Sequence, residues 1–312
     1  MEGSSESQPV FGLMGNIGKD AALEAIGRTM DFLARRGISF LVEEEIRDRL
    51  GGGVTEGGAG RGAGRGAGRD EVAAKADYII TFGGDGTMLA VAQHALLHDT
   101  PILGVNLGKL GFLADLGVDE VFWAIEEIID GKHTIERRMT ITGMLDDSPE
   151  QYHALNDIVI AKTGSAKIIS IDAFVDDEFL ASFLADGLIV STPTGSTAYS
   201  LATGGPVVVP ESNVIIISPI SAHTLTARPV IVSGDSRISV CARTEEGSVM
   251  VMADGRVHAR ERTAVDAEIR RGQHSVALVK NLGPKYFETL RRKLSWGQDG
   301  RFTPETSDPA QA

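Results

Sequence analysis

The sequence predicts an α/β N-terminal domain with a Rossmann-like parallel sheet, then a mostly β C-terminal domain, then a helix that packs back on the chain. Three observations predict this order. Apolar runs alternate with amphipathic helical stretches over residues 1–132. Short runs rich in Val and Ile recur between turn residues over residues 133–282. Residues 283–312 return to helical periodicity and end in a polar tail, which we expect to be disordered.

The N-terminal domain follows from alternating strand and helix signals. A first strand, VFGLMG, precedes a helix whose apolar face carries Leu23, Ile26, Met30 and Leu33. A later helix, VDEVFWAIEEIIDGK, is expected to end at Gly131. This alternation is typical of a parallel sheet covered by helices. The other predicted strands are ISFLVE, DYIITF and PILGVN, at residues 38–43, 77–82 and 101–106.

A low-complexity run of Gly, Ala and Arg interrupts this alternation at residues 51–69. Such a composition buries too little apolar surface to offset the entropy lost on ordering, so we expect a mobile surface loop. A role of its Arg-Gly repeats in RNA binding is a weaker hypothesis, because no aromatic residue is interleaved for base stacking.

The C-terminal domain is predicted from β-rich runs separated by turn residues. The final helix, PKYFETLRRKLSW, carries Phe287, Leu290 and Leu294 on one side, which is the side expected to pack on another element. The β-rich runs are KIISIDAFV, GLIVST, NVIIIS, RPVIVS, RISVCA and SVMVMAD.

Composition limits the class of protein. The chain has 312 residues, of which 42% are hydrophobic and 23% charged, which predicts a globular protein of about two domains. We expect a cytoplasmic location, because no apolar run is long enough to span a bilayer and the start is unlike a signal peptide. Cys241 is the only cysteine, so an intrachain disulfide is excluded. The net charge of -13 argues against nucleic acid as a partner, and no membrane partner is expected.

The stretch from Gly83 to Thr87 places one carboxylate, Asp85, among three glycines where a strand ends and a helix begins. A tight turn alone would explain an isolated Asp-Gly pair. At the end of a strand in an open α/β sheet, however, free backbone N–H groups attract phosphates, and glycines let a polyphosphate approach. A carboxylate there could bind a metal ion or accept a proton.

Further polar motifs lie in the predicted β domain. LNDIVI places Asn156 and Asp157 in an otherwise apolar strand, and ADGLIVSTPTGSTAYSLATGGP contains Asp186 and Tyr199. The segments PISAHTLTARP and MADGR add His223 and Asp254. Asp186 and Asp254 each precede a glycine, so each can also be read as an ordinary turn residue.

Together these motifs resemble the NAD kinase family, in the same order from about Val10 to Gly297. GGDG alone is moderately specific, because diacylglycerol kinases and phosphofructokinases resemble it there. TPTGSTAYSLATGGP is far more specific. The motifs that carry the resemblance are GGDGTML, GVNLGKLGFLAD, LNDIVI, GLIVSTPTGSTAYSLATGGP, HTLTARP and LRRKLSW.

The resemblance implies transfer of the γ-phosphoryl group of ATP to the 2′-hydroxyl group of the adenosine ribose of NAD, with Mg²⁺, giving NADP and ADP. It implies that Asp85 faces this hydroxyl as general base or orienting group, and that it is also a possible metal ligand. The implied NAD-binding residues are Asn156, Asp157, Asp186, Thr194, Thr197, Ala198 and Tyr199. The implied phosphate and ATP region contains Gly83, Gly84, Gly86, Thr87, Lys109, His223 and Asp254, although Lys109 could equally be a solvated lysine.

Other interpretations remain at this point. The chain could be another GGDG-type kinase, acting on a lipid or a sugar, or a non-catalytic NAD-sensing module, which should tolerate loss of Asp85. The resemblance also implies small-molecule nucleotides as partners and a homodimer or homotetramer. The choice between ATP and polyphosphate as phosphate donor, and between NAD and NADH as acceptor, stays open.

Overall fold

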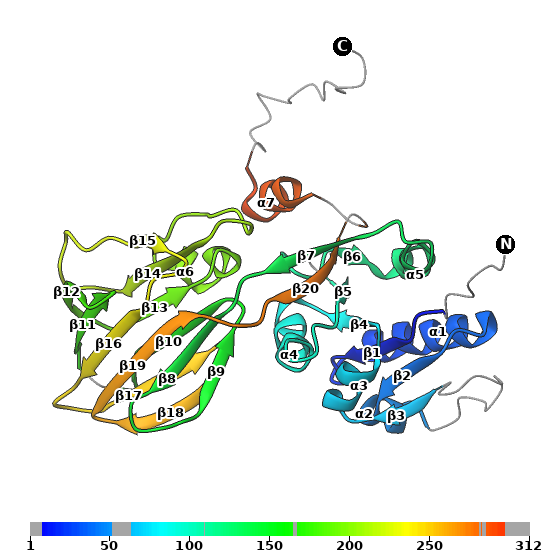
Figure 1. Cartoon of the computed structure of the whole chain (residues 1–312), viewed down its shortest axis with the longest axis horizontal. Coiled ribbons are helices and arrows are strands. Elements are labelled where there is room, and N and C mark those ends of the chain that lie inside the picture. The colour runs from blue at the N-terminus through cyan, green and yellow to red at the C-terminus, as the bar shows by residue number, and fades with distance from the viewer. Residues whose placement is uncertain are drawn as a thin grey trace, which may run out of the picture. The chain divides into compact units, whose positions relative to one another are not determined.

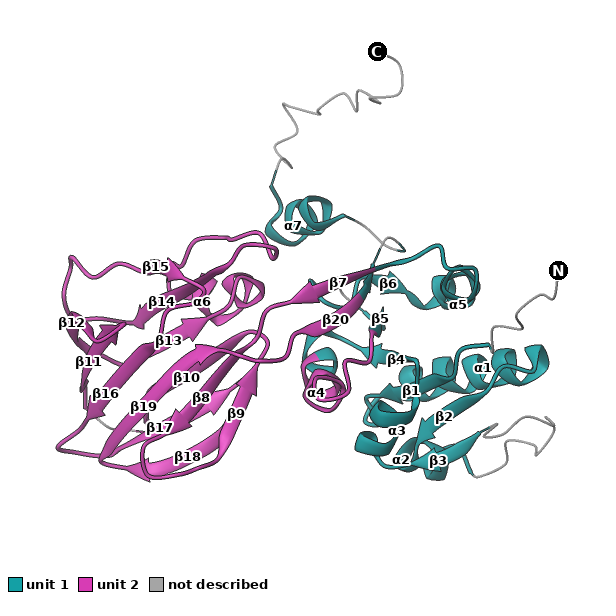
Figure 2. Cartoon of the chain, viewed as in Figure 1, with its two compact units in different colours: residues 1–88, 102–134, 279–312 teal, residues 89–101, 135–278 magenta. Residues whose placement is uncertain are grey.

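The structure is a computed structural model that describes residues 8–51, 64–108, 110–164, 167–280, 282 and 285–296. It divides into two compact units (Figure 2). Unit 1 contains residues 1–88, 102–134 and 279–312, and unit 2 contains residues 89–101 and 135–278. Unit 2 therefore takes in a segment of the expected N-terminal domain, and unit 1 takes in the end of the chain. The chain changes units inside helix α4 (Asp85–Ala95) and inside strands β7 (Thr134–Arg138) and β20 (Val276–Lys280).

Unit 1 is built on a parallel sheet, as predicted. Its strands lie in the order β3-β2-β1-β4-β5, followed by β20 and β7, and β6 pairs with β5 (Figure 1). The pairs from β3 to β6 are all parallel. These strands are β1 (Phe11–Gly15), β2 (Phe40–Glu43), β3 (Arg65–Ala67), β4 (Tyr78–Gly83), β5 (Ile102–Asn106) and β6 (Leu116–Gly117).

Helices cover both faces of this sheet because side chains alternate along β1. Phe11 and Leu13 are fully buried in one apolar cluster with residues of α1 (Asp20–Arg36) and α5 (Val121–Ile129). Gly12 faces the other way, where a Cβ atom would lie 2.6 Å from Val72 of α3 (Arg69–Lys75). The other helices of this unit are α2 (Glu44–Arg49), the 3₁₀ helix η1 (Val118–Glu120) and α7 (Tyr286–Leu294).

The expected loop at residues 51–69 needs a correction at its C-terminal end. Arg65–Ala67 forms strand β3, which pairs in parallel with β2, and Arg69 begins α3. Backbone pairing with an existing strand orders a segment that shows no apolar periodicity, and Ala67 is buried. Residues 52–63 of the run lie outside the described residues.

Unit 2 is mostly β, as predicted, and consists of two six-stranded sheets. One has the order β15-β14-β13-β10-β17-β18 and the other β12-β11-β16-β19-β8-β9. Neighbouring strands in both sheets are antiparallel. The first sheet comprises β10 (Asp157–Thr163), β13 (Gly187–Ser191), β14 (Val214–Ile220), β15 (Val230–Ser233), β17 (Ser248–Ala253) and β18 (Arg256–Arg262). The second comprises β8 (Ile141–Leu145), β9 (Gln151–Ala154), β11 (Ile169–Val175), β12 (Glu178–Ala185), β16 (Ile238–Arg243) and β19 (Ala264–Arg271).

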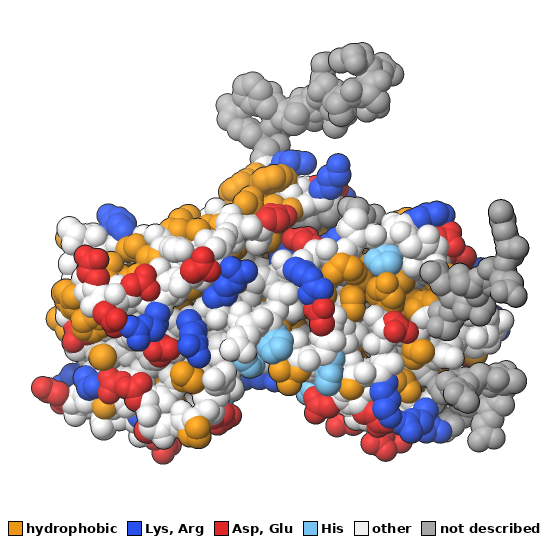
Figure 3. Space-filling model, in the orientation of Figure 1, with side chains coloured by type: hydrophobic (Ala, Val, Ile, Leu, Met, Phe, Trp, Pro, Cys, Tyr) orange, Lys and Arg blue, Asp and Glu red, His pale blue; other side chains and the backbone are white. Residues whose placement is uncertain are grey.

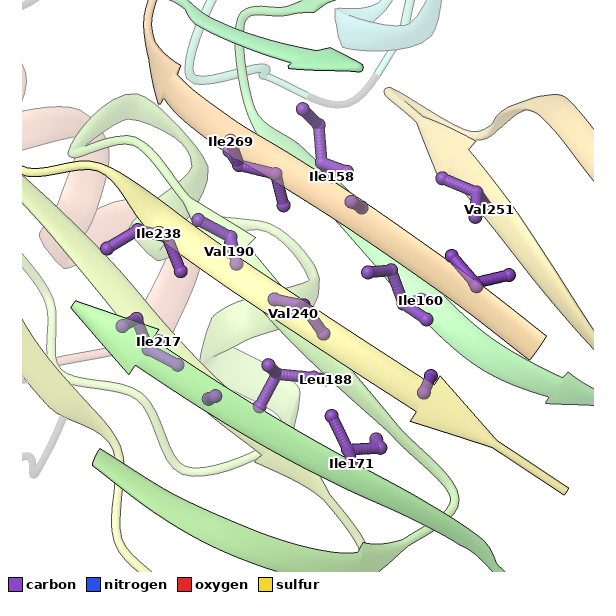
Figure 4. Packing of buried hydrophobic residues seen from close by; sticks show 14 of the residues in the cluster. Ile158, Ile160, Ile171, Leu188, Val190, Ile217, Ile238, Val240, Val251 and Ile269 are labelled. Atoms are coloured by element: carbon purple, nitrogen blue, oxygen red, sulfur yellow. The ribbon is translucent and has the colours of Figure 1, made fainter. Parts of the chain in front are cut away.

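The two sheets of unit 2 face each other across one core. Ile160 and Leu188 from the first sheet lie in the same buried cluster as Ile171 and Val240 from the second (Figure 4). Val159 is buried on the opposite face of the first sheet. Apolar residues on both faces explain why β10 reads as a continuous apolar run. A 3₁₀ helix, η2 (Thr194–Thr197), and a short helix, α6 (Tyr199–Ala202), follow β13.

Helix α7 forms where it was predicted, but only part of its predicted apolar side is buried. Thr289 and Leu290 are buried, whereas Phe287 is 58% exposed. The expectation that Phe287 packs inward was therefore wrong, because tertiary contacts select the buried face of a helix with few apolar residues. Figure 3 shows hydrophobic side chains exposed beside Lys and Arg side chains over this helix. Among the described helices, none is long and apolar enough to cross a membrane.

Candidate functional site

The turn between β4 and α4 lies at the position where open α/β sheets bind ligands. β4 and β1 are neighbours, β2 and β3 lie beyond β1, and β5 lies beyond β4. The strand order therefore reverses between β1 and β4, and ligands bind at the carboxyl ends of strands at such a switch point. β4 ends at Gly83 and α4 begins at Asp85. A Cβ atom on Gly83 would lie 2.2 Å from Oγ1 of Thr87, so no side chain fits there.

The carboxylate of Asp85 is held by a second segment of unit 1. The backbone N–H of Phe112 donates to Oδ2 at 3.0 Å. The N–H groups of Leu113 and Ala114 donate to Oδ1 at 3.0 and 3.2 Å. Gly111 permits this close approach, since a Cβ atom there would lie 2.1 Å from Oδ1. Three amide donors fix the carboxylate and stabilise its negative charge.

Two lysines near this segment were not assigned from the sequence. Nζ of Lys280 forms an ion pair with Oδ2 of Asp115 at 2.6 Å, and both side chains are mostly buried. Nζ of Lys293 on α7 lies 3.8 Å from Oδ2 of Asp85. Both lysines are far from these aspartates in the sequence, so no local signal could have identified the pairs. Lys109, which was assigned to the phosphate region, lies outside the described residues.

In unit 2, the segment after β13 folds onto the Asn156 peptide. The Thr192 N–H donates to the carbonyl oxygen of Asn156 at 2.9 Å, and its Oγ1 donates to the carbonyl oxygen of Leu155 at 2.6 Å. A Cβ atom on Gly195 would lie 2.1 Å from the same Asn156 oxygen. Thr194 is buried, and Nη1 of Arg138 lies 3.4 Å from its hydroxyl oxygen. The structure thus brings the Asn156 peptide together with the 3₁₀ helix η2, which contains Thr194 and Thr197.

Asp157 is a buried carboxyl group in this cluster, with 6% of its surface exposed. Burial and, to a smaller extent, the charge of Asp254 raise its pKa from 3.8 to about 7, and a hydrogen bond from the Tyr199 backbone opposes the shift. The Tyr199 residue itself is 43% exposed, which leaves its ring available for stacking. Ala198 lies between η2 and α6, and its N–H donates to the carbonyl oxygen of Gly195 at 2.9 Å.

Asp254 lies with the same residues and supports their backbone. Its Oδ2 accepts the Leu155 N–H at 2.8 Å, and its Oδ1 accepts those of Asn156 and Asp157 at 2.8 and 3.2 Å. Nε2 of Gln93 lies 3.4 Å from Oδ2. Burial raises the Asp254 pKa, and these backbone hydrogen bonds oppose that shift.

Asp186 and His223 lie at the other end of β13. Oδ1 of Asp186 pairs with Nζ of Lys162 at 2.7 Å, and the His223 N–H donates to the carbonyl oxygen of Leu184 at 2.8 Å. Asn156 and Thr194 flank the opposite end, so the two ends are about 20 Å apart along the strand. Within one chain, unit 2 therefore does not bring Asp186 and His223 to the Asn156 cluster.

Comparison with known proteins matches both parts of the chain. Residues 11–133 match the model of the ATP-NAD kinase N-terminal domain, and residues 155–281 match the ATP-NAD kinase C-terminal domain. A relative named NAD kinase from Geobacter sp. (strain M21) is 38% identical over 281 residues, which cover 89% of this chain and 95% of the relative.

Two solved structures share the fold. Yeast NADH kinase complexed with NADH has a TM-score of 0.84 at 24% identity, with 96% of this chain and 91% of that chain covered. An NAD kinase from Archaeoglobus fulgidus in complex with ATP has a TM-score of 0.69 at 24% identity, with coverages of 90% and 98%. With both domain models matched and relatives aligned over most of its length, the chain belongs to the ATP-NAD kinase family.

Proposed function

We propose that this chain transfers the γ-phosphoryl group of Mg-ATP to the 2′-hydroxyl group of the adenosine ribose of NAD, giving NADP and ADP. One observation carries the proposal. Each matched family domain contains one cluster of site residues, the β4–α4 turn in residues 11–133 and the Asn156 cluster in residues 155–281. A phosphate-binding turn and a nucleoside-binding cluster are the two parts that phosphoryl transfer to a nucleotide requires.

Asn156, Asp157 and Tyr199 recognise the adenosine of NAD in this proposal. An ionised Asp157 accepts hydrogen bonds from ribose hydroxyl groups, and the Asn156 amide both donates and accepts. The exposed Tyr199 ring stacks on a base. Thr194, Thr197 and Ala198 shape the same region, because η2 is folded against the Asn156 peptide.

Asp85 receives the acceptor hydroxyl group through Oδ2. An ionised carboxylate offers about four lone-pair positions, two on each oxygen. Two amide donors occupy Oδ1, whereas one amide donor occupies Oδ2. The free position on Oδ2 can therefore accept the proton of the 2′-hydroxyl group. The 2′-oxygen then forms its bond to the γ-phosphorus while the bond to the β–γ bridging oxygen breaks, and that electron pair leaves with ADP.

Mg²⁺ enters with the triphosphate as part of the substrate. In nucleotide sites Mg²⁺ is held by phosphates and one or two carboxylates. Within the described ranges, no group of three or more His, Cys, Asp or Glu side chains could hold a metal ion. Asp85 has one free position on Oδ2, which cannot serve both the hydroxyl group and a metal. We therefore assign the free position on Oδ2 to the hydroxyl group. The metal ion is assigned to the phosphates, whose negative charge it would partly neutralise.

We also propose that the protein is a homo-oligomer and is located in the cytoplasm. Asp186 and His223 lie at the end of β13 that is remote from Asn156, so a second copy of the chain would have to supply them to an NAD site. Phe179 and Leu184 on the edge strand β12 are 56% and 52% exposed, which is compatible with a covered surface in such an assembly. A homodimer or homotetramer is accordingly proposed.

The test is to incubate purified protein with Mg-ATP and NAD and to measure NADP with a strictly NADP-dependent dehydrogenase. We expect NADP, and parallel reactions with NADH or polyphosphate define the acceptor and donor. Reactions with diacylglycerol or a hexose as acceptor, followed by ADP release, test the GGDG-type alternatives, which the relatives do not favour. No NADP despite measurable NAD binding would contradict the proposal and favour the sensing module.

A further inference from the structure

Lys293 places a positive charge at the β4–α4 turn. Neither the packing of α7 nor the hydrogen bonding of Asp85 requires this charge. It lies in the last turn of α7, and its Nζ is 3.8 Å from Oδ2 of Asp85. The same Nζ lies 5.1 Å from the centre of the Phe112 ring, whose backbone N–H donates to Asp85. About a third of each charged side chain is exposed, at 30% for Lys293 and 31% for Asp85.

The pairing with Asp85 leaves the ammonium group with unused donors. At 3.8 Å the two groups attract each other but do not form a hydrogen bond. Asp85 already accepts three amide hydrogen bonds, so Lys293 is not required to satisfy it. Within the described part of the chain, we find no hydrogen bond that uses the three N–H donors of Lys293. A positive charge with free donors therefore lies beside the glycine turn, accessible to solvent.

The neighbouring basic residue behaves differently. Nη2 of Arg292 lies 3.6 Å from Oε1 of Glu288, one turn earlier on the same helix. This is an ordinary exposed pair between residues i and i+4, which stabilises a helix by a few tenths of a kcal/mol. Lys293, in contrast, points at a residue of another element. The two adjacent cations thus provide a matched comparison.

We propose that Lys293 binds the triphosphate of the phosphate donor at the β4–α4 turn and stabilises its negative charge during phosphoryl transfer. This inference rests on the proposed function. In the structure the ammonium group lies near Asp85 and the Phe112 ring. When the triphosphate arrives, Lys293 donates to its oxygens, because a flexible side chain with free donors binds an anion of several charges more strongly than one distant carboxylate.

Lys293 takes no chemical part in the phosphoryl transfer. The 2′-oxygen gains the γ-phosphorus, its proton passes to Asp85, and the electron pair of the broken bond leaves on ADP. Lys293 exchanges no proton and forms no covalent bond. It lowers the energy of the negative charge that develops on the phosphoryl oxygens and on the ADP leaving group.

The first test measures turnover. We expect Lys293→Met to lower kcat/KM for Mg-ATP by about 30-fold or more, as for loss of a charged hydrogen bond to the reacting group. Lys293→Arg should keep most of the activity, because the charge remains. Arg292→Met, the matched control, should stay within about twofold. Equal losses in the Met variants of both residues would show damage to α7 and overturn the inference, as would unchanged kcat/KM in Lys293→Met.

The second test separates triphosphate binding from a role that depends on Asp85. Binding of Mg-ATP is measured by calorimetry in Asp85→Asn and in the double variant Asp85→Asn with Lys293→Met. If Lys293 binds the triphosphate, the double variant should bind Mg-ATP about tenfold or more weakly, and NAD about equally well. Equal Mg-ATP affinities would show that Lys293 only balances the charge of Asp85, and would overturn the inference.

The two proposals fail in distinguishable ways. If wild-type protein makes NADP but neither test responds to Lys293, the role of Lys293 is wrong and the kinase function stands. If wild-type protein makes no NADP but the second test shows the loss of Mg-ATP affinity, triphosphate binding by Lys293 stands and the acceptor assignment fails. Melting temperatures of all variants show whether α7 remains folded.

Discussion

Two hydrogen bonds join Asp157, the first residue of β10, to Asp254, the residue that directly follows β17. The Asp254 N–H donates to the carbonyl oxygen of Asp157 at 3.0 Å, and Oδ1 of Asp254 accepts the Asp157 N–H at 3.2 Å. The same carboxylate also accepts the N–H groups of Leu155 and Asn156. One side chain thus fixes three successive peptide units of the segment that presents Asn156 and Asp157.

Asp254→Ala should destabilise the protein and weaken NAD binding together. Three partly buried N–H groups lose their acceptor, and each unsatisfied buried donor costs about 1–3 kcal/mol. We expect a loss of at least about 2 kcal/mol in the free energy of unfolding, measured by urea titration. Glu246→Ala is the control, because the exposed pair of Glu246 with Lys167 should contribute less than about 1 kcal/mol. Equal stability of the two variants would contradict the supporting role of Asp254.

Stability should fall as the pH rises, because of Asp157. Its pKa is raised from 3.8 to about 7 by burial and by Asp254, so the folded protein binds a proton that the unfolded chain releases. The penalty of ionising Asp157 is absent below about pH 4 and complete above about pH 7. The free energy of unfolding should decrease between these values by at most about 1.4 kcal/mol per pH unit from this group. Asp157→Asn should flatten the slope, and an unchanged slope would contradict the assignment.

Asp85→Asn should lower kcat by at least about 100-fold, a typical contribution of a general base. The amide oxygen can still accept the N–H groups of Leu113 and Ala114, and only the Phe112 N–H loses its acceptor, so the turn should remain folded. Because the proposed adenosine contacts all lie in unit 2, the dissociation constant of NAD should change little. Steady-state kinetics and calorimetry measure the two quantities, and near-normal turnover would refute the role of Asp85.

Gly195→Ala should be poorly tolerated. A Cβ atom there would lie 2.1 Å from the Asn156 carbonyl oxygen and 2.5 Å from its carbonyl carbon, both of them backbone atoms. We expect a cost of about 1–3 kcal/mol and loss of NAD affinity, since η2 must move away from Asn156. Gly68→Ala is the control, because no atom lies within 4 Å of its added Cβ atom and its φ is -64°. Similar thermal unfolding of both variants would show that η2 can shift freely.

The Tyr199 ring should contribute to NAD binding by stacking. Tyr199→Ala should weaken binding by about 1–3 kcal/mol, the usual contribution of an aromatic ring to a base. Tyr199→Phe should bind NAD almost normally, because the ring and the backbone N–H near Asp157 are retained. Calorimetry with NAD distinguishes the variants. A large loss in Tyr199→Phe would assign the contribution to the hydroxyl group instead.

Local signals predicted most of the fold. Apolar runs such as DYIITF and the 3.6-residue period of α1 are set by nearby residues, so the parallel sheet and its helices were expected. Strand β19 was not predicted, because the prediction relied on nearly continuous apolar runs, whereas polar and buried side chains alternate along this strand. Strand β3 carries no apolar pattern and forms by backbone pairing with β2.

The candidate site was predicted less completely than the fold. The three glycines and Asp85 predict the β4–α4 turn, because glycine and aspartate are residue types that favour turns. The amides of Phe112, Leu113 and Ala114 have no sequence signature, since any residue supplies a backbone N–H. Asp186 follows Asn156 in the motif order, yet strand geometry separates them, because β13 carries the chain from one end of the sheet to the other.

The division of unit 1 into three chain segments governs when it can fold. Val279 and Leu282 lie in the same buried cluster as Phe11 and Leu13, although nearly the whole chain separates them. A ribosome must therefore translate most of the message before this core can close. C-terminal truncation before residue 279 should leave an incomplete N-terminal core and an exposed apolar surface, which invites chaperone binding or aggregation.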